Sequence, residues 1–157
     1  MRANEVMTQI PNCCIPSTTA RTAATILKKF ELGALPVVDS YSSRKLVGIV
    51  TDRDLCVRAL AEPEQPGETL VEDCMTRDPV CCNPESDVRQ VLALMASRSV
   101  RRIPVVDREH RAVGMITLAD LVYRQALPPK HLCAALARIV APLKQVPGAH
   151  AAGAGAS

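Results

Sequence analysis

Threonine and aspartate recur in this chain at a spacing that suits ligand chemistry. They stand as Thr51 and Asp54 in the segment GIVTDRD and as Thr117 and Asp120 in the segment GMITLAD. Unpaired N–H groups at a helix start favour a phosphate, and a carboxylate accepts hydrogen bonds from two neighbouring sugar hydroxyls. The same spacing is that of a capping box, in which hydroxyl and acid satisfy the helix's own N–H groups. Both interpretations stay open, and the two are compatible.

The two motifs belong to an internal repeat. Residues 7–39 align with residues 75–107 at an offset of 68, with 11 of 33 positions identical, and the match continues at an offset of 66. Repeated units bury their apolar faces against each other and form equivalent clefts where they join. We therefore expect one compact body with two related clefts.

Each repeat is predicted to run strand, helix, strand, strand, helix. Short extended pieces at 13–15 and 80–82 end at a proline, and helices follow, with Ser17 or Thr18 and Ser86 as N-caps. Two further strands, at 34–38 and 46–50 and at 103–106 and 112–116, are joined by polar hairpin links. The second helices start at Thr51 and Thr117. We predict a linker at 61–70, an amphipathic helix at 130–146 and a disordered tail at 147–157.

This order of elements, the paired glycine-to-aspartate motifs and the two Pro-Val-Val-Asp strands closely resemble a tandem pair of cystathionine-β-synthase (CBS) domains, a Bateman module. The resemblance covers residues 5–125, with repeats at 5–60 and 71–125. It implies an α/β (α+β) fold in which two β-α-β-β-α repeats pack about a pseudo-twofold axis, with the C-terminal helix added, and a homodimer of such modules. It also implies a regulatory adenosine-containing ligand (AMP, ADP, ATP or S-adenosylmethionine), no cofactor and no catalysis.

Within this resemblance, Asp54 and Asp120 match the ribose-binding aspartate, and Thr51 and Thr117 are the phosphate candidates beside them. The glycines at 48 and 114 keep the strand slim enough for a close approach by backbone or ligand.

Basic residues differ between the repeats. Arg101 and Arg102 precede a strand where the family often carries cations that face a phosphate, whereas the first repeat has Gly33-Ala34 there. Arg53 is a further phosphate candidate, and the second repeat has Ala119 at that position. Arginine suits phosphate because its planar fork donates two parallel hydrogen bonds. We predict asymmetric clefts, while plain solvated charges remain the alternative for the arginine pair.

The adenine slot is expected beside the first extended piece of each repeat. Its predicted lining is Cys14, Ile15, Pro16 and Val38 in one repeat, and Cys82, Asn83, Pro84 and Val106 in the other.

Paired cysteines depart from the common family pattern. Because neighbouring strand residues point to opposite faces, one thiol of each doublet should enter the core or cleft. Cys13 and Cys81, or Cys14 and Cys82, could meet across the axis as a disulfide or part of a zinc site, although buried cysteine also serves as a small hydrophobe. A thiol- or metal-responsive adaptor without nucleotide is therefore the alternative function, and the three histidines form no metal motif.

Composition limits the remaining classes of function. The net charge of +3 is mild and the aromatic residues make up 2% of the chain, which argues against a nucleic-acid partner. We expect no membrane span, no signal peptide, a cytoplasmic location and an unidentified effector protein as the receiver of the signal.

Overall fold

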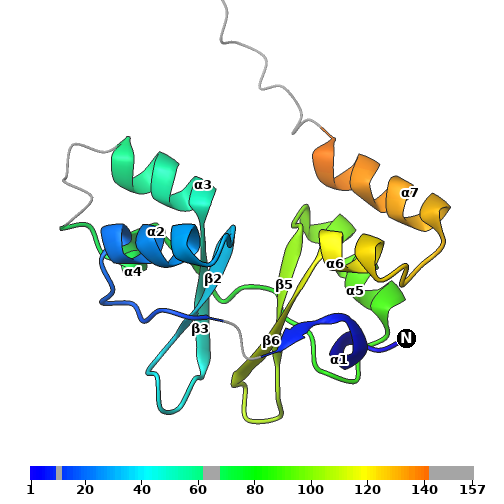
Figure 1. The fold of residues 1–157 in the computed structure, drawn as a ribbon, viewed down its shortest axis with the longest axis horizontal. Helices are drawn as coiled ribbons and strands as arrows, with labels where there is room; N and C mark the ends of the chain where they lie inside the picture. The colour runs from blue at the N-terminus through cyan, green and yellow to red at the C-terminus, as the bar shows by residue number, and fades with distance from the viewer. Residues whose placement is uncertain (10–11, 62–67, 142–157) are drawn as a thin grey trace, which may run out of the picture.

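The computed structural model describes residues 1–9, 12–61 and 68–141 as two similar α/β bodies side by side (Figure 1). Each body holds a three-stranded sheet, in the order β2-β3-β4 in the first repeat and β1-β6-β5 in the second. The predicted fold class, a pair of α/β repeats with an added C-terminal helix, is confirmed.

The two longest strands of each sheet pair with each other in antiparallel orientation, and β3 and β6 are the central strands. In the first repeat β2 (Ala34–Val38) pairs with β3 (Leu46–Thr51), and in the second β5 (Arg102–Val106) pairs with β6 (Ala112–Thr117). All five residues of β2 are buried, because helices cover one side of the sheet and the other repeat approaches the other side. The predicted positions of these strands are correct to within one residue.

The sequence interpretation did not foresee that the repeats exchange their leading segments. Helix α1 (Ala3–Val6) and strand β1 (Thr8–Gln9) come first in the chain, yet β1 pairs with β6 and α1 packs into the core of the second repeat. Likewise α4 (Val71–Cys74) and β4 (Thr76–Arg77) join the core and sheet of the first repeat. Separating the repeats would therefore remove a strand from each sheet.

The first long helix of each repeat begins one or more residues later than predicted. Thr19 caps α2 (Ala20–Lys29) and Asp87 caps α5 (Val88–Arg98). The predicted caps were wrong because Thr18 and Ser86 make a different contact. Their hydroxyls accept hydrogen bonds from the backbone N–H groups of Ile15 and Asn83, at 3.1 and 3.2 Å. These bonds close the turn that precedes each helix.

The extended pieces that precede those turns are shorter than predicted. A single parallel bridge joins Cys14 to Val37, and another joins Cys82 to Val105. Since the prolines at 16 and 84 lack an N–H group, the pairing does not continue into a ladder.

The second helix differs between the repeats. In the first, α3 (Asp52–Asp54) runs on as a π-helix, η1 (Leu55–Leu60), whereas in the second α6 (Leu118–Tyr123) stops after six residues. The added helix α7 (Pro129–Val140) follows α6 and packs on α5 and α6 through residues such as Leu132 and Ala135. The predicted span of 130–146 is correct up to residue 140, and residues 62–67 of the linker and 142–157 lie outside the described residues.

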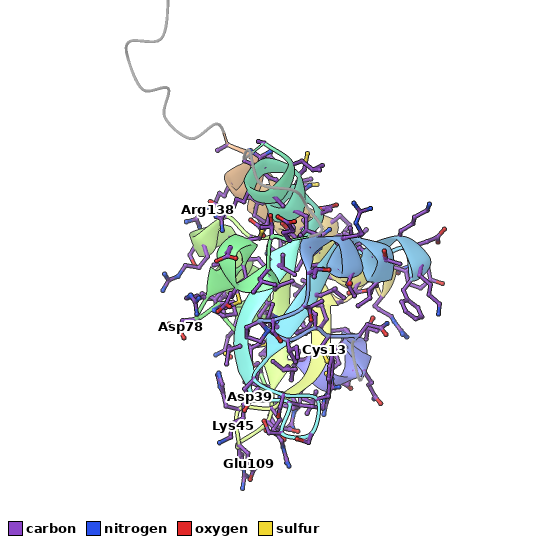
Figure 2. The ribbon with its side chains drawn as sticks, turned by 90° about the vertical axis from the view of Figure 1, so that its left-hand side faces the viewer. Cys13, Asp39, Lys45, Asp78, Glu109 and Arg138 are labelled. Carbon is purple, nitrogen blue, oxygen red and sulfur yellow. The ribbon has the colours of Figure 1, made fainter. Side chains whose placement is uncertain are left out.

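The two repeats meet in a small apolar cluster of Val38, Leu46, Val106 and Ala112. Beside it the two hairpins exchange backbone hydrogen bonds: Leu46 N donates to His110 O at 3.0 Å, and Ala112 N donates to Arg44 O at 2.9 Å. Figure 2 shows hairpin residues such as Asp39, Lys45 and Glu109 at one end of the molecule, with Arg138 of α7 at the other. The helix starts that carry the Thr-Asp pairs lie away from this hairpin end.

Candidate ligand-binding site

The Thr-Asp pair of the second repeat forms a closed network at the start of α6. Thr117 donates from its backbone N and its hydroxyl to Asp120 Oδ2, at 2.7 and 2.8 Å, and Asp120 N donates back to the Thr117 hydroxyl at 3.1 Å. The capping box expected from the sequence is thus present. None of these three bonds involves Asp120 Oδ1, which has no hydrogen-bond partner among the described residues, and Asp120 is only half-buried.

The first repeat has the same network with one addition. Thr51 donates from its backbone N and its hydroxyl to Asp54 Oδ2, at 3.0 and 2.8 Å. Here Asp54 Oδ1 also faces Arg58 Nε at 3.8 Å. The Arg58 guanidinium is in turn anchored through Nη1 on the carbonyls of Cys74 and Met75, at 2.8 and 3.3 Å.

Glycine at 48 and at 114 allows the exchanged segments to come close. A Cβ atom on Gly48 would lie 3.1 Å from the Thr76 carbonyl oxygen, and one on Gly114 would lie 3.2 Å from that of Thr8. A side chain at either position would also collide with the methionine that precedes the exchanged strand. The backbone of each exchanged strand therefore makes the close approach that was predicted for these two glycines.

Arg102 reaches from the second repeat to the first. Its guanidinium lies against Gly33, where an added Cβ would be 2.8 Å from Arg102 Cζ, and Gly33 O accepts a hydrogen bond from Asp52 N at 3.2 Å. The cation therefore lies near the start of α3, although its own backbone pairs with Thr117 in β6. Arg101 and Arg53 are exposed to solvent at the two helix starts.

The residues predicted for the adenine slot are separated from the Thr-Asp pair of the same repeat. Arg102 pairs with Thr117 at one end of β5, and Val106 pairs with Ala112 at the other end. The predicted residues of the second repeat line a hollow of about 720 Å³ at that second end, which Asp120 does not border; its lining is Cys81, Cys82, Asn83, Pro84, Glu85, Val106, Asp107 and Arg108.

Their counterparts in the first repeat lie deeper. Cys14 and Val38 are both 0% exposed, the first in the core of its repeat and the second in the cluster between repeats. Neither offers a surface to a ligand, whereas Pro16 is partly exposed.

The cysteine doublets divide as the strand geometry predicts. Cys14 and Cys82 pack with the cores of their own repeats, whereas Cys13 and Cys81 contact the cluster that joins the repeats. Burial, and to a lesser degree the neighbouring cysteine, raises the pKa of Cys14 and of Cys82 from 9.0 to about 12. These two thiols are therefore protonated and unreactive at neutral pH.

Metal ligands do not gather in the described part of the chain, where no three His, Cys, Asp or Glu side chains lie close enough together to hold an ion. Among the same residues, no helix is both long enough and apolar enough to cross a bilayer.

Sequence reasoning missed Arg58. The sequence does contain a signal for its ion pair, because an acid and an arginine that are four residues apart on a helix can form one. It was ambiguous, however, since Arg124 follows Asp120 at the same spacing and makes no ion pair with it among the described residues.

Comparison with known families confirms the predicted family and fold. The model of the CBS domain matches residues 3–60 and 71–126, and the chain belongs to this family. It is 39% identical over 120 residues to the uncharacterized protein YlbB of Bacillus subtilis, covering 76% of this chain and 79% of YlbB. It is also 35% identical over 127 residues to inosine-5'-monophosphate dehydrogenase of Methanocaldococcus jannaschii, covering 81% of this chain but only 24% of that enzyme.

Solved structures of CBS pairs resemble this one closely. The CBS domain pair of protein MJ0100, in complex with 5'-methylthioadenosine and S-adenosyl-L-methionine, has a TM-score of 0.71 and 29% identity, covering 80% of this chain and 95% of that one. CBSX2 in complex with AMP has a TM-score of 0.69 and 26% identity, covering 79% and 95%. Ligands bound by these proteins all contain adenosine.

Proposed function

We propose that this protein is a regulatory module that binds an adenosine-containing ligand beside a helix start and passes its state to a partner protein. The observation that carries the proposal is the half-buried Asp120, whose Oδ2 is fixed by Thr117 while Oδ1 stays available. The adenosyl ligands of the related CBS pairs support this class of ligand.

Each residue at the helix start has a separate role in this proposal. Asp120 Oδ1 accepts hydrogen bonds from the ribose hydroxyls, which need an acceptor held in a fixed direction. Thr117 positions that carboxylate, because the single proton of its hydroxyl is already donated to Asp120 Oδ2 and is not free for a phosphate. Arg101, which is exposed at the start of α6, supplies the positive charge for a phosphate group, with Arg102 next to it in the chain.

Ligand binding becomes a signal through the packing of the repeats. A ligand shifts a conformational equilibrium only by its differential affinity for the two states. The exchanged strands and the shared apolar cluster connect the two repeats, so that a change in one cleft bears on the other repeat. We assign no reaction to the chain, which corresponds to the CBS portion of the dehydrogenase, and we propose the cytoplasm as its location.

A homodimer is part of the proposal. Helices α2 and η1 border a hollow of about 500 Å³ whose lining is mostly apolar, and Leu60 at its edge is 65% exposed. We propose that a second copy covers this face, since large exposed apolar surfaces are typical of interfaces. Leu60→Asp should convert the dimer to a monomer in analytical ultracentrifugation, and a wild-type monomer at all concentrations would contradict the assignment.

Isothermal titration with AMP, ATP and S-adenosylmethionine tests the ligand. Asp120→Ala should weaken binding by about 1 to 3 kcal/mol, the value of charge-assisted hydrogen bonds to the ribose. Unchanged affinity in the Asp54→Ala/Asp120→Ala double variant would reject both acids as ribose ligands, and the absence of heat with every nucleotide would reject the function.

A thiol-responsive adaptor is the second candidate. Cys13 and Cys81 both contact the cluster between the repeats, and Arg44 Nη1 lies 3.5 Å from Cys13 Sγ. A mild oxidant should then join the two thiols and raise the melting temperature. Mass spectrometry that finds both thiols free after oxidation would exclude this role.

A further inference from the structure

The two pseudo-equivalent aspartates have different surroundings. Asp54 and Asp120 are each bound through Oδ2 by the threonine three residues earlier, with closely similar distances. They differ at Oδ1, which faces Arg58 Nε at 3.8 Å in the first repeat and has no cation within ion-pairing distance among the described residues of the second. Oδ1 is the atom that the proposed function reserves for ribose.

Arg58 is held in place by more than its acid. Its Nη1 donates to the carbonyl oxygens of Cys74 and Met75, at 2.8 and 3.3 Å, at the junction of α4 and β4. Both acceptors belong to the segment that the second repeat contributes to the first. The guanidinium is thus held by two hydrogen bonds and faces Asp54 as an ion pair at 3.8 Å. The Arg58 side chain is 49% exposed, whereas Asp54 beside it keeps only 16% of its side chain exposed.

The backbone explains why Arg124 does not do the same. Arg58 lies inside η1, the π-helical continuation of α3, so it stays on the helix that starts at Asp52 and includes Asp54. In contrast, α6 ends at Tyr123, and Arg124 is its C-cap, followed by Gln125 with a positive φ of 50°. Arg124 N still donates to Asp120 O at 2.9 Å, and the helix does not extend beyond this residue, at the point where the first repeat continues as a π-helix. Such π-helical segments are often found at functional sites.

We infer that Arg58 is a specificity-determining residue that occupies the Asp54 carboxylate, so that each chain binds one adenosyl ligand, at Asp120. This inference rests on the proposed function. A ribose at Asp54 has to displace an anchored guanidinium from Oδ1, whereas a ribose at Asp120 displaces only water. If the ribose cannot make its charge-assisted hydrogen bond to Asp54 Oδ1, ligand affinity at that site should be weaker by roughly tenfold or more.

Native mass spectrometry counts the ligands on each chain directly. With AMP and, separately, S-adenosylmethionine as probes, the wild-type protein should hold one ligand per chain, and Arg58→Met should hold two. Arg124→Met is the matched control, because it removes the same side chain at the equivalent position of the second repeat, and it should still hold one. At a probe concentration that just saturates the wild type, Asp120→Ala should leave most chains without ligand, and Arg58→Met/Asp120→Ala should hold one, now at Asp54.

The variants separate the possible failures. Arg58→Gln removes the charge but keeps a donor for the Cys74 carbonyl, and it should also bind two ligands. It replaces Arg58→Met in the test if circular dichroism shows that Arg58→Met is poorly folded. Two ligands on the wild type, or one ligand on both well-folded Arg58 variants, would overturn the role of Arg58 and leave the proposed function standing. No ligand on any variant with either probe would overturn the proposed function itself, and the inference with it.

Discussion

The two repeats share one backbone plan but close their helical faces differently. In the first, the hollow between α2 and η1 is open to solvent, with small residues such as Ala20 and Ala24 on α2. In the second, the equivalent positions on α5 are Val88 and Leu92, and α7 packs over that helix. Duplication thus preserved the sheets and the capping networks. Side-chain size and one added helix fill the groove beside α5 in the second repeat, where a hollow of about 570 Å³ opens between α6 and α7 instead.

The largest expected effect comes from a matched pair of core leucines. Leu121 is fully buried in the second repeat, whereas its counterpart Leu55 lines the open hollow. Leu121→Ala should lower the free energy of unfolding by about 2 to 5 kcal/mol, and Leu55→Ala should cost about 1 kcal/mol less, because the cost depends on how well the site relaxes. Urea denaturation measures both, and equal losses would show that the two faces are equally closed.

The buried thiols predict a loss of stability at alkaline pH. Folding raises the pKa of Cys14 and of Cys82 from 9.0 to about 12, so below pH 9 both thiols are protonated in either state and their contribution is fully present. Between pH 9 and about 12 the unfolded chain loses these protons first, and stability falls as the pH rises. Urea titrations from pH 7 to 11 should show a shallower fall for Cys14→Ala/Cys82→Ala than for wild type, and parallel curves would contradict the shifts.

The capping threonines should behave alike in stability and differently in binding. Thr51→Ala and Thr117→Ala each remove a side-chain cap and should cost about 1 kcal/mol in thermal unfolding. Thr117→Ala should in addition weaken nucleotide binding, since Asp120 loses its positioning partner, while Thr51→Ala should not. Equal effects on binding would mean that both repeats take part in it.

The smallest expected effect concerns the hairpin tips. Arg111 pairs with Asp107 at 2.7 Å, whereas the equivalent Lys45 gives Asp39 only its backbone N–H, at 3.0 Å. The Arg111 side chain is 51% exposed, so Arg111→Ala should lower the urea midpoint only slightly, and the effect should disappear in 1 M salt. Lys45→Ala, the control, should change nothing measurable by the same denaturation assay.

The sequence predicted the regular elements well because their signals are local. Runs of β-type residues joined by polar links located strands such as β3 and β6, and the spacing from Thr117 to Asp120 predicted the capping network. The exchange of β1 and β4 could not be read in this way, because two-residue strands carry no periodicity and their partners lie in the other repeat.

The surroundings of the candidate site were less predictable for a related reason. Arg58 and Arg124 have the same spacing from their acids, and only the length and type of the helix separate them. The contact of Arg102 with Gly33 likewise depends on how the repeats pack, which no local pattern encodes.

The most direct test follows the backbone amides of Thr117 and Thr51 by NMR during titration with AMP. Both amides donate to an aspartate Oδ2, so each reports on its own carboxylate. The proposed binding at Asp120 predicts a large, saturable shift of the Thr117 resonance and little change at Thr51. Shifts confined to Cys82 and its neighbours in the hollow at the far end of β5, with both threonine amides unmoved, would contradict it.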